Sequence, residues 1–231
     1  VDTTTRTGRV FSLNPSSGAL VQIGAQFPAG YKPYCLAYHA GRLWCGTTYR
    51  SSGADVAGDI SWFRPNIDTA WTLDRTMSQG RGCSFLYSYK GELFAGNWTG
   101  STGTTAVVEK RSSVGAWTVS LSITVGTGSL FINAVQFGTN LYVTLFNQTG
   151  GATTVRKFDG TTWTTALTAT NSKPLPAIWV DAGIIYAGGG GDNAIANLWT
   201  STDGTTWTDR SANLTGNTDK SGLALLGILA T

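Results

Sequence analysis

Hydrophobic and polar residues alternate along this chain in short runs, which Gly, Asn, Ser and Pro separate. Alternation with a period of two is typical of β-strands that have one buried face. No stretch longer than about ten residues shows the 3.6-residue period of an α-helix. The pattern therefore predicts an all-β fold.

Two phrases recur along the chain and divide it into repeats. Trp followed by Thr occurs at intervals of 44 to 46 residues, at Trp71, Trp117, Trp163 and Trp207. A second phrase, Gly-x-Leu/Ile-aromatic, begins about 20 residues after a position of the first phrase, at Gly41, Gly91 and Gly183. Weaker copies begin at Thr139 and Gly227. A fixed period of 20 to 50 residues is typical of repeat architectures.

Each full repeat is predicted to contain four strands. They cover residues 35–39, 42–47, 59–63 and 71–75 in the second repeat; 84–89, 92–97, 106–110 and 117–122 in the third; 131–136, 141–146, 154–158 and 163–167 in the fourth; and 177–180, 184–188, 197–201 and 207–210 in the fifth. Half a repeat remains at each end of the chain, with strands at 9–13 and 20–23 and at 223–226 and 228–231.

Four-stranded antiparallel units that repeat around an axis form a β-propeller, in which only short sheet edges are exposed. We expect the two terminal halves to share one blade and so to close the ring. The sequence thus predicts a single domain, residues 1–231, folded as a five-bladed β-propeller. A linear β-solenoid is the alternative, but it would need polar capping repeats, and residues 223–231 are among the most apolar of the chain.

Composition limits the classes of partner. Charged residues make up 13% of the chain, about half the ordinary share, which favours a rigid strand-rich body. The net charge of +3 is too small to indicate nucleic acid by itself. No apolar run is long enough for a membrane-spanning helix. We therefore expect neither nucleic acid nor a membrane as the partner.

The cysteines and the histidine suggest no reactive centre. A turn at residues 39–42 would pair Leu36 with Cys45, which leaves Cys35 out of register for a bridge to Cys45. We therefore predict that Cys35, Cys45 and Cys83 are free thiols.

His39, the single histidine, is predicted to be exposed in that turn without a carboxylate partner. We predict no metal and no cofactor, and a loop calcium site at Asp55 and Asp59 or at Asp192 is the alternative.

One segment resembles a known motif. Ser201-Thr-Asp203-Gly204-Thr-Thr-Trp207 resembles the Asp-box of sialidase-like β-propellers, although it is one residue shorter, and residues 158–163 are a partial copy. The resemblance implies a hairpin turn between the third and fourth strands of a blade, remote from any active site. The residues themselves indicate the same, because Asp-Gly favours tight hairpins.

The catalytic machinery of that family is missing. If the resemblance extended to catalysis, it would imply an arginine triad, a tyrosine nucleophile and an acid on the innermost strands. The strands predicted to be innermost here carry almost no charge. Other glycosidases would need carboxylates that face the central funnel. Of the 13 acidic residues only Asp181 lies next to an innermost strand, at its far end. We therefore predict that the chain is not an enzyme.

Cations precede the innermost strand in four of the five blades. They are Lys32, Arg81, Lys173 and Lys220. On a ring they would surround the mouth of the funnel and attract anions. Aromatic, amide and basic residues lie nearby in the sequence: Tyr31, Tyr34, Phe131, Tyr49, Arg50, Asn97 and Trp98. Connections between blades also carry Lys and Arg without a role, so an ordinary surface is the alternative.

The repeated aromatic residues are expected to pack between sheets rather than to form five equivalent sugar pockets.

Aromatic rings with cations and amides suit a glycan, above all an anionic one. We predict a binding module that recognises a glycan or a cell-surface receptor through the blade-connection face, in an extracellular or virion-associated setting. The alternative is a structural or assembly propeller of a phage or other virion particle, in contact with other virion proteins, because this Thr-, Gly- and Asn-rich composition resembles phage-tail modules. A glycoside hydrolase is a minor alternative.

Overall fold

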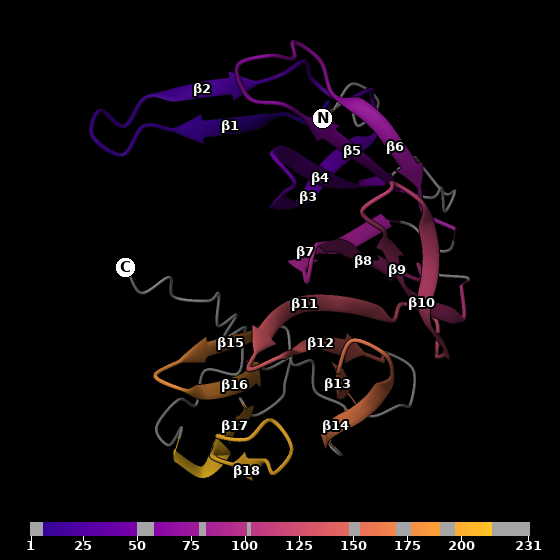
Figure 1. Ribbon diagram of the computed structural model, residues 1–231, viewed down its shortest axis with the longest axis vertical. Helices are drawn as coiled ribbons and strands as arrows, with labels where there is room; N and C mark the ends of the chain where they lie inside the picture. The colour runs from indigo at the N-terminus through magenta and orange to yellow at the C-terminus, as the bar shows by residue number, and fades with distance from the viewer. Residues whose placement is uncertain are drawn as a thin grey trace, which may run out of the picture. The chain divides into compact units, whose positions relative to one another are not determined.

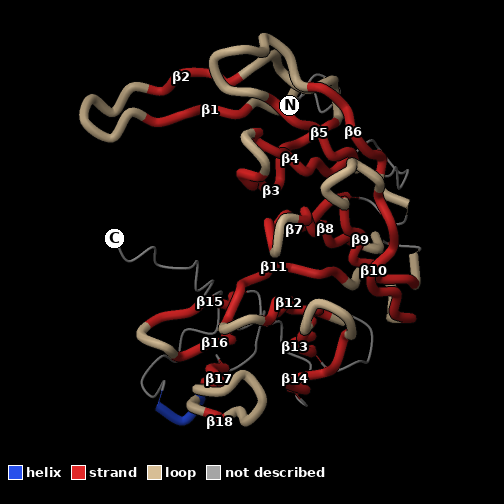
Figure 2. The backbone as a smooth tube through the Cα atoms, viewed as in Figure 1, coloured by secondary structure: helices blue, strands red, loops and turns tan. Residues whose placement is uncertain are grey.

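The computed structural model of the protein describes residues 7–49, 58–78, 82–100, 103–147, 153–169, 177–189 and 197–213. The chain divides into two compact units, Val1–Ile123 and Thr124–Thr231. Apart from one short helical turn, the described elements of both units are strands, as Figures 1 and 2 show.

The first unit begins with a separate hairpin of β1 (Val10–Leu13) and β2 (Leu20–Ile23). Two antiparallel sets of four strands follow, in which neighbours along the chain pair with each other. The first set is β3 (Tyr31–His39), β4 (Arg42–Tyr49), β5 (Asp59–Phe63) and β6 (Thr72–Thr76). The second set is β7 (Gly82–Tyr89), β8 (Glu92–Trp98), β9 (Thr105–Arg111) and β10 (Trp117–Thr124).

The second unit contains two further sets of the same order. The first is β11 (Leu130–Phe137), β12 (Asn140–Phe146), β13 (Thr153–Phe158) and β14 (Trp163–Ala169). The second is β15 (Ala177–Asp181), β16 (Ile184–Gly189), β17 (Asn197–Ser201) and β18 (Thr208–Asp209). A 3-10 turn at Ser211–Asn213 follows β18.

The structure confirms the all-β class and the antiparallel pairing. The described strands agree with the predicted ones to within a few residues, except that β3 begins at Tyr31 and β18 is shorter. The predicted strands at 223–226 and 228–231 lie outside the described residues. The single domain, the number of blades and the closure of a ring therefore stay predictions. Within the described ranges, no helix has the length and apolarity of a membrane span.

The Gly-x-Leu/Ile-aromatic phrase marks a tight turn between the first two strands of a set. Ala40-Gly41, Lys90-Gly91 and Ala182-Gly183 each have two successive positive φ angles. This is the type I′ conformation, whose twist suits a two-residue hairpin. The turn at Ala40-Gly41 pairs Leu36 with Cys45, so the predicted register is confirmed.

The repeated aromatic residues of the second strands belong to the core. Trp44, Phe94 and Tyr142 are each at most 1% exposed. Tyr186 is partly buried and stacks on Trp179, with ring centroids 5.0 Å apart. Packing rather than sugar binding is confirmed for Trp44, Phe94 and Tyr142.

The tryptophans at or just before the fourth strand of a set contact the preceding repeat. The indole N–H of Trp71 donates to the Ile23 carbonyl of β2 at 3.3 Å. The indole N–H of Trp117 donates to the Asp74 carboxylate of β6 at 2.6 Å. Trp207 packs against a core cluster that includes Tyr142 and Val155. These tryptophans therefore hold neighbouring repeats together.

Two of the turns between third and fourth strands are built around an aspartate. Asp203 accepts hydrogen bonds from the backbone N–H groups of Thr205 and Thr206, each at 2.7 Å, and from the Ser201 hydroxyl at 3.0 Å. Asp159 accepts equivalent bonds from Thr161 and Thr162. These backbone donors lower the pKa of Asp159 to about 2 and that of Asp203 further. In this structure both carboxylates stabilise turns.

Candidate functional site

The predicted binding surface is only partly described. Arg50, Arg81, Lys173 and Lys220 lie outside the described residues, and of Tyr49 only the backbone is described. The remaining members lie on three strands: Tyr31, Lys32 and Tyr34 on β3, Asn97 and Trp98 on β8, and Phe131 on β11.

In the first unit, strand pairing brings one end of two neighbouring repeats into a single row. Lys32 pairs with Thr48, Thr48 pairs with Gly82, and Gly82 pairs with Trp98. A Cβ atom at Gly82 would lie 2.4 Å from the Thr48 side chain, so the glycine permits the close approach of β4 and β7. At about 4.8 Å per strand, the Lys32 and Trp98 backbones are about 14 Å apart. We call this edge the Lys32–Trp98 row. In the described part of the chain the Lys32 ammonium has no ion-pair partner.

Asn97 does not belong to an exposed surface. Its side chain is fully buried, accepts a hydrogen bond from the Val107 N–H at 2.8 Å, and donates to the Thr105 carbonyl at 3.3 Å. Thr47, at the same place in the preceding repeat, bonds in the same way to the backbone of Asp59. Asn97 therefore supports the connection between the second and third strands, and its proposed ligand contact is corrected.

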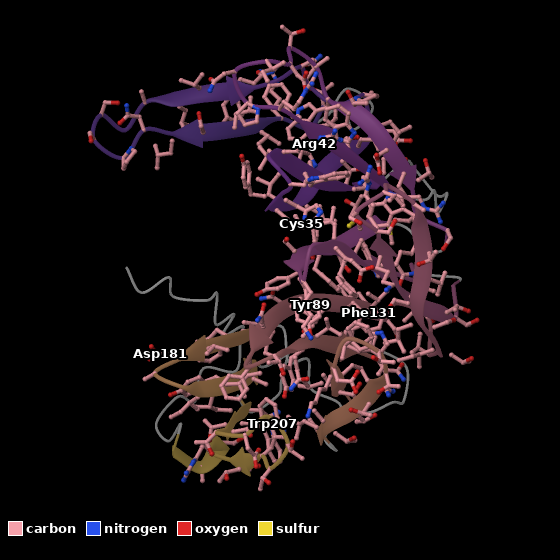
Figure 3. The ribbon with its side chains drawn as sticks, in the orientation of Figure 1. Cys35, Arg42, Tyr89, Phe131, Asp181 and Trp207 are labelled. Carbon is pink, nitrogen blue, oxygen red and sulfur yellow. The ribbon has the colours of Figure 1, made fainter. Side chains whose placement is uncertain are left out.

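Phe131 is also fully buried (Figure 3). The pairing of β11 with β12 shifts register between Phe131 and Ala134. Phe131 was predicted to lie at the binding surface because it is close in the sequence to a connection between repeats, and that position does not reveal that its ring is buried. Phe131 belongs to the core, and its proposed ligand contact is corrected as well.

One face of β3 is unexpectedly open. Tyr34, Leu36 and Tyr38 alternate along the strand and are 55%, 49% and 65% exposed. Of the three, only Tyr34 was predicted from the sequence to lie at the surface. Alternation alone does not reveal whether a strand face meets solvent or another sheet.

His39 is not the exposed turn residue that the sequence predicted. It is 7% exposed, and its Nδ1 atom lies 2.8 Å from the Ser88 hydroxyl of the neighbouring repeat. Its ring also lies near Trp44, whose indole N–H donates to the His39 carbonyl at 3.1 Å. The prediction was wrong because Ser88 is 49 residues away in the sequence.

The contact between His39 and Ser88 is not arranged as a catalytic pair. Burial, and then the nearby Arg111 cation, lower the pKa of His39. In a serine hydrolase a carboxylate stabilises the imidazolium that forms when the serine attacks. Here a guanidinium opposes that charge. The pair is better suited to holding the first hairpin of the second repeat against β7.

The buried imidazole makes stability depend on pH. Because the folded pKa of His39 is lowered, protonation favours the unfolded chain, so the stabilisation is complete above about pH 6.5 and declines as the pH falls through the unfolded and then the folded pKa. The slope cannot exceed about 1.4 kcal/mol per pH unit for one proton. Urea unfolding at several pH values should show this decline, and the His39→Gln variant should flatten it. An unchanged slope in the variant would contradict this role.

A hollow of about 270 Å³ lies at the opposite end of β3 from Lys32, between the β3–β4 and β9–β10 turns. Ala40, Arg42, Trp44, Arg111, Ser113, Val114 and Gly115 line it. The Arg42 guanidinium stacks 4.0 Å from the centre of the Trp62 ring and makes no hydrogen bond or ion pair with any described residue. The guanidinium of Arg111 is held by Asp74 at 2.9 and 3.2 Å. Chemically, Arg42 offers free donors for one small anion.

The acidic side chains of the first unit are mostly engaged in structure. Glu109 is fully buried and accepts hydrogen bonds from Arg75 at 2.8 Å and from the Ser78 N–H at 2.8 Å. Asp68 is paired with Arg64, and Glu92 with Lys110. These contacts leave little acidic chemistry for a site in this unit.

The first strands of the four sets, β3, β7, β11 and β15, carry one carboxylate in the described structure. This is Asp181, exposed at the end of β15 beside the Ala182-Gly183 turn (Figure 3). Among the described residues, no group of three His, Cys, Asp or Glu side chains is placed to hold a metal ion. Asp59 accepts a hydrogen bond from Thr76, whereas Asp55 and Asp192 lie outside the described ranges.

Comparison with known proteins gives no family for this chain. No protein-family model matches the sequence, and no curated protein is significantly similar to it.

Proposed function

We propose that this chain is a non-enzymatic binding module, built as a five-bladed β-propeller, that recognises an anionic glycan or cell-surface ligand. The ring determines which surfaces are open to a ligand.

The strongest support for a fifth blade is an exposed leucine side chain on β3, Leu36, whose equivalents in two other repeats are buried. Leu36, Leu86 and Ile178 each lie four residues before the first residue of the two-residue turn. Leu86 is 6% exposed and packs with Trp44 and Ile60 of the preceding repeat. Ile178 is 4% exposed and packs with Tyr142 and Val155 of the preceding repeat. Leu36, at 49% exposed, has no such partner among the described residues.

The N-terminal hairpin supplies the outer half of the missing blade. Trp71 binds β2 as Trp117 binds β6, so β2 takes the place of an outer strand. The hairpin leaves apolar side chains 47% to 65% exposed: Phe11, Leu13, Leu20 and Val21. A two-stranded sheet is at best marginally stable by itself. We propose that residues 223–226 and 228–231 add the two inner strands, cover Leu36 and Tyr38, and close the ring.

The Lys32–Trp98 row carries the proposal of function. It places a cation and an aromatic residue at the same end of neighbouring repeats, and Arg81 directly precedes Gly82 of the row in the sequence. Tyr31 and Tyr34 flank Lys32 on β3. Sugar faces stack on aromatic rings, and sulfate or carboxylate groups pair with cations. Arg50, Lys173 and Lys220 would extend the surface around the ring.

The test is a glycan array that includes sulfated and carboxylated glycans, followed by titration of the best ligand with two single variants. We expect Lys32→Ala to weaken binding about tenfold and to reduce its salt dependence. Arg42→Ala removes an equal charge from the start of β4, beside the far end of β3, and should leave binding unchanged. If only Arg42→Ala weakens binding, the ligand lies in the hollow beside Arg42 instead. The absence of any glycan ligand would contradict the proposal.

Assembly within a phage or other virion particle is the second candidate. It draws support from two equivalent turns between third and fourth strands that expose aliphatic side chains, Ile67 at 68% and Val114 at 89%. Such residues suit contacts with another protein more than with a sugar. Copurification with virion proteins, which Ile67→Ser and Val114→Ser disrupt, would favour this candidate. Hydrolysis of a glycan would instead revive the minor alternative of a glycoside hydrolase.

A further inference from the structure

Two cysteines from neighbouring repeats meet in the first unit. The Sγ atoms of Cys35 on β3 and Cys83 on β7 lie 3.7 Å apart, which is van der Waals contact, and both thiols are free. Figure 3 labels Cys35 beside β7. Register excludes a bridge between Cys35 and Cys45, whereas Cys83 is 48 residues away from Cys35 in the sequence, so no local pattern relates the two.

A glycine makes room for the two sulfur atoms. A Cβ atom at Gly46, the β4 residue that pairs with Cys35, would lie 2.6 Å from the Cys35 Sγ and 2.5 Å from the Cys83 Sγ. Real Cβ atoms do not approach sulfur so closely, so both sulfur atoms occupy the space that a side chain at position 46 would take. The two thiols therefore share one small site over β4.

The third cysteine does not compete for this site. Adjacent residues of a strand point to opposite faces. Cys45 packs with Val10 and Phe27, whereas Cys83, and Cys35 beside it, belong to the cluster around Trp44. Cys45 is also fully buried.

We infer that Cys35 and Cys83 form an oxidation site, at which a small-molecule disulfide such as oxidised glutathione converts the two thiols into an intramolecular disulfide that joins β3 to β7. Cys35 is the more accessible of the two, because Cys83 is fully buried and Cys35 is only partly buried. The Cys35 thiolate attacks the small disulfide and releases one thiol. The Cys83 thiolate then attacks the Cys35 sulfur atom and releases the second. The protein loses two protons and two electrons, and the two electrons reduce the oxidant to two thiols.

The bond would tie together the innermost strands of the second and third repeats. Disulfides persist in oxidising surroundings and are rare in the cytosol. The site therefore agrees with the proposed extracellular or virion-associated setting, but it does not depend on which ligand the protein binds.

The test uses the full chain, with oxidised and reduced glutathione at a series of ratios. Free-thiol titration should fall from three to one, the mass should fall by two hydrogens, and peptide mapping should link residues 35 and 83. The midpoint of thermal unfolding should rise by about 5 to 15 °C. Cys45→Ser should still form the link, whereas Cys35→Ser and Cys83→Ser should not.

In the folded chain the link could fail to form only because the oxidant reaches Cys83 slowly. Refolding from urea in the same oxidising buffer removes this explanation, because Cys83 is then accessible. If the refolded chain carries only glutathione adducts, three free thiols or a link to Cys45, the inference is overturned. The link between residues 35 and 83 as the main product of both experiments supports it.

Discussion

Replacing Glu109 with alanine is expected to lower the free energy of unfolding by about 2 to 3 kcal/mol. Glu109 lies on β9 and is fully buried, and its carboxylate accepts hydrogen bonds from Arg75 of β6 and from the backbone and hydroxyl of Ser78. The variant removes the acceptor and leaves the Arg75 charge and the Ser78 N–H without a partner. The Arg75 side chain is 32% exposed, so water solvates part of its charge, and the larger share of the loss comes from the Ser78 N–H that no longer has an acceptor. Urea unfolding of the two proteins measures the difference.

A double variant serves as the control for this prediction. Replacing both charged residues, as in Arg75→Met with Glu109→Leu, removes the ion pair and keeps apolar volume, so it should recover part of the loss. The Ser78 N–H still lacks its acceptor in this variant, so recovery should be incomplete. A loss below about 1 kcal/mol in Glu109→Ala would show that this carboxylate does not hold the second and third repeats together.

The proposed ring predicts a large difference between two leucines that are similarly exposed in the described structure. Leu36 of β3 is 49% exposed and Leu73 of β6 is 58% exposed. If residues 223–231 cover β3, then Leu36→Asp places an unpaired charge in an interface and should cost about 3 to 5 kcal/mol. Leu73→Asp, on an outer strand, should change stability by no more than about 0.5 kcal/mol. Urea unfolding of the two variants gives the comparison.

Equal effects of the two substitutions would contradict the ring. A small change in both would mean that the β3 face stays in solvent. A large change in Leu73→Asp alone would mean that the outer strand, rather than β3, meets another sheet.

Repetition in the sequence was enough to predict most of the strands in the described residues. The Gly-x-Leu/Ile-aromatic phrase located the type I′ turns, and the turn at Ala40-Gly41 determined the pairing of Leu36 with Cys45. Such features are local, because a two-residue turn fixes the register of the strands that it joins. They were therefore accessible without any knowledge of tertiary contacts.

The errors concern contacts between residues that are distant in the sequence. His39 is buried because Ser88 of the next repeat packs against it, and Cys35 meets Cys83 for the same reason. Phe131 was placed at the binding surface because it is close in the sequence to a connection between repeats, whereas its ring packs in the core. Asn97 was assigned to a ligand because its role in supporting a connection is visible only from the hydrogen bonds to Thr105 and Val107.

Hydroxyl-radical footprinting of the full chain tests the closed ring most directly, because it measures side-chain exposure without any substitution. Leu73 serves as the exposed reference and Leu86 as the buried one, at 58% and 6% exposed. If the C-terminal strands complete the fifth blade over β3, Leu36 should be oxidised about as slowly as Leu86. Oxidation of Leu36 as fast as that of Leu73 would show that nothing covers β3 and that the ring is open.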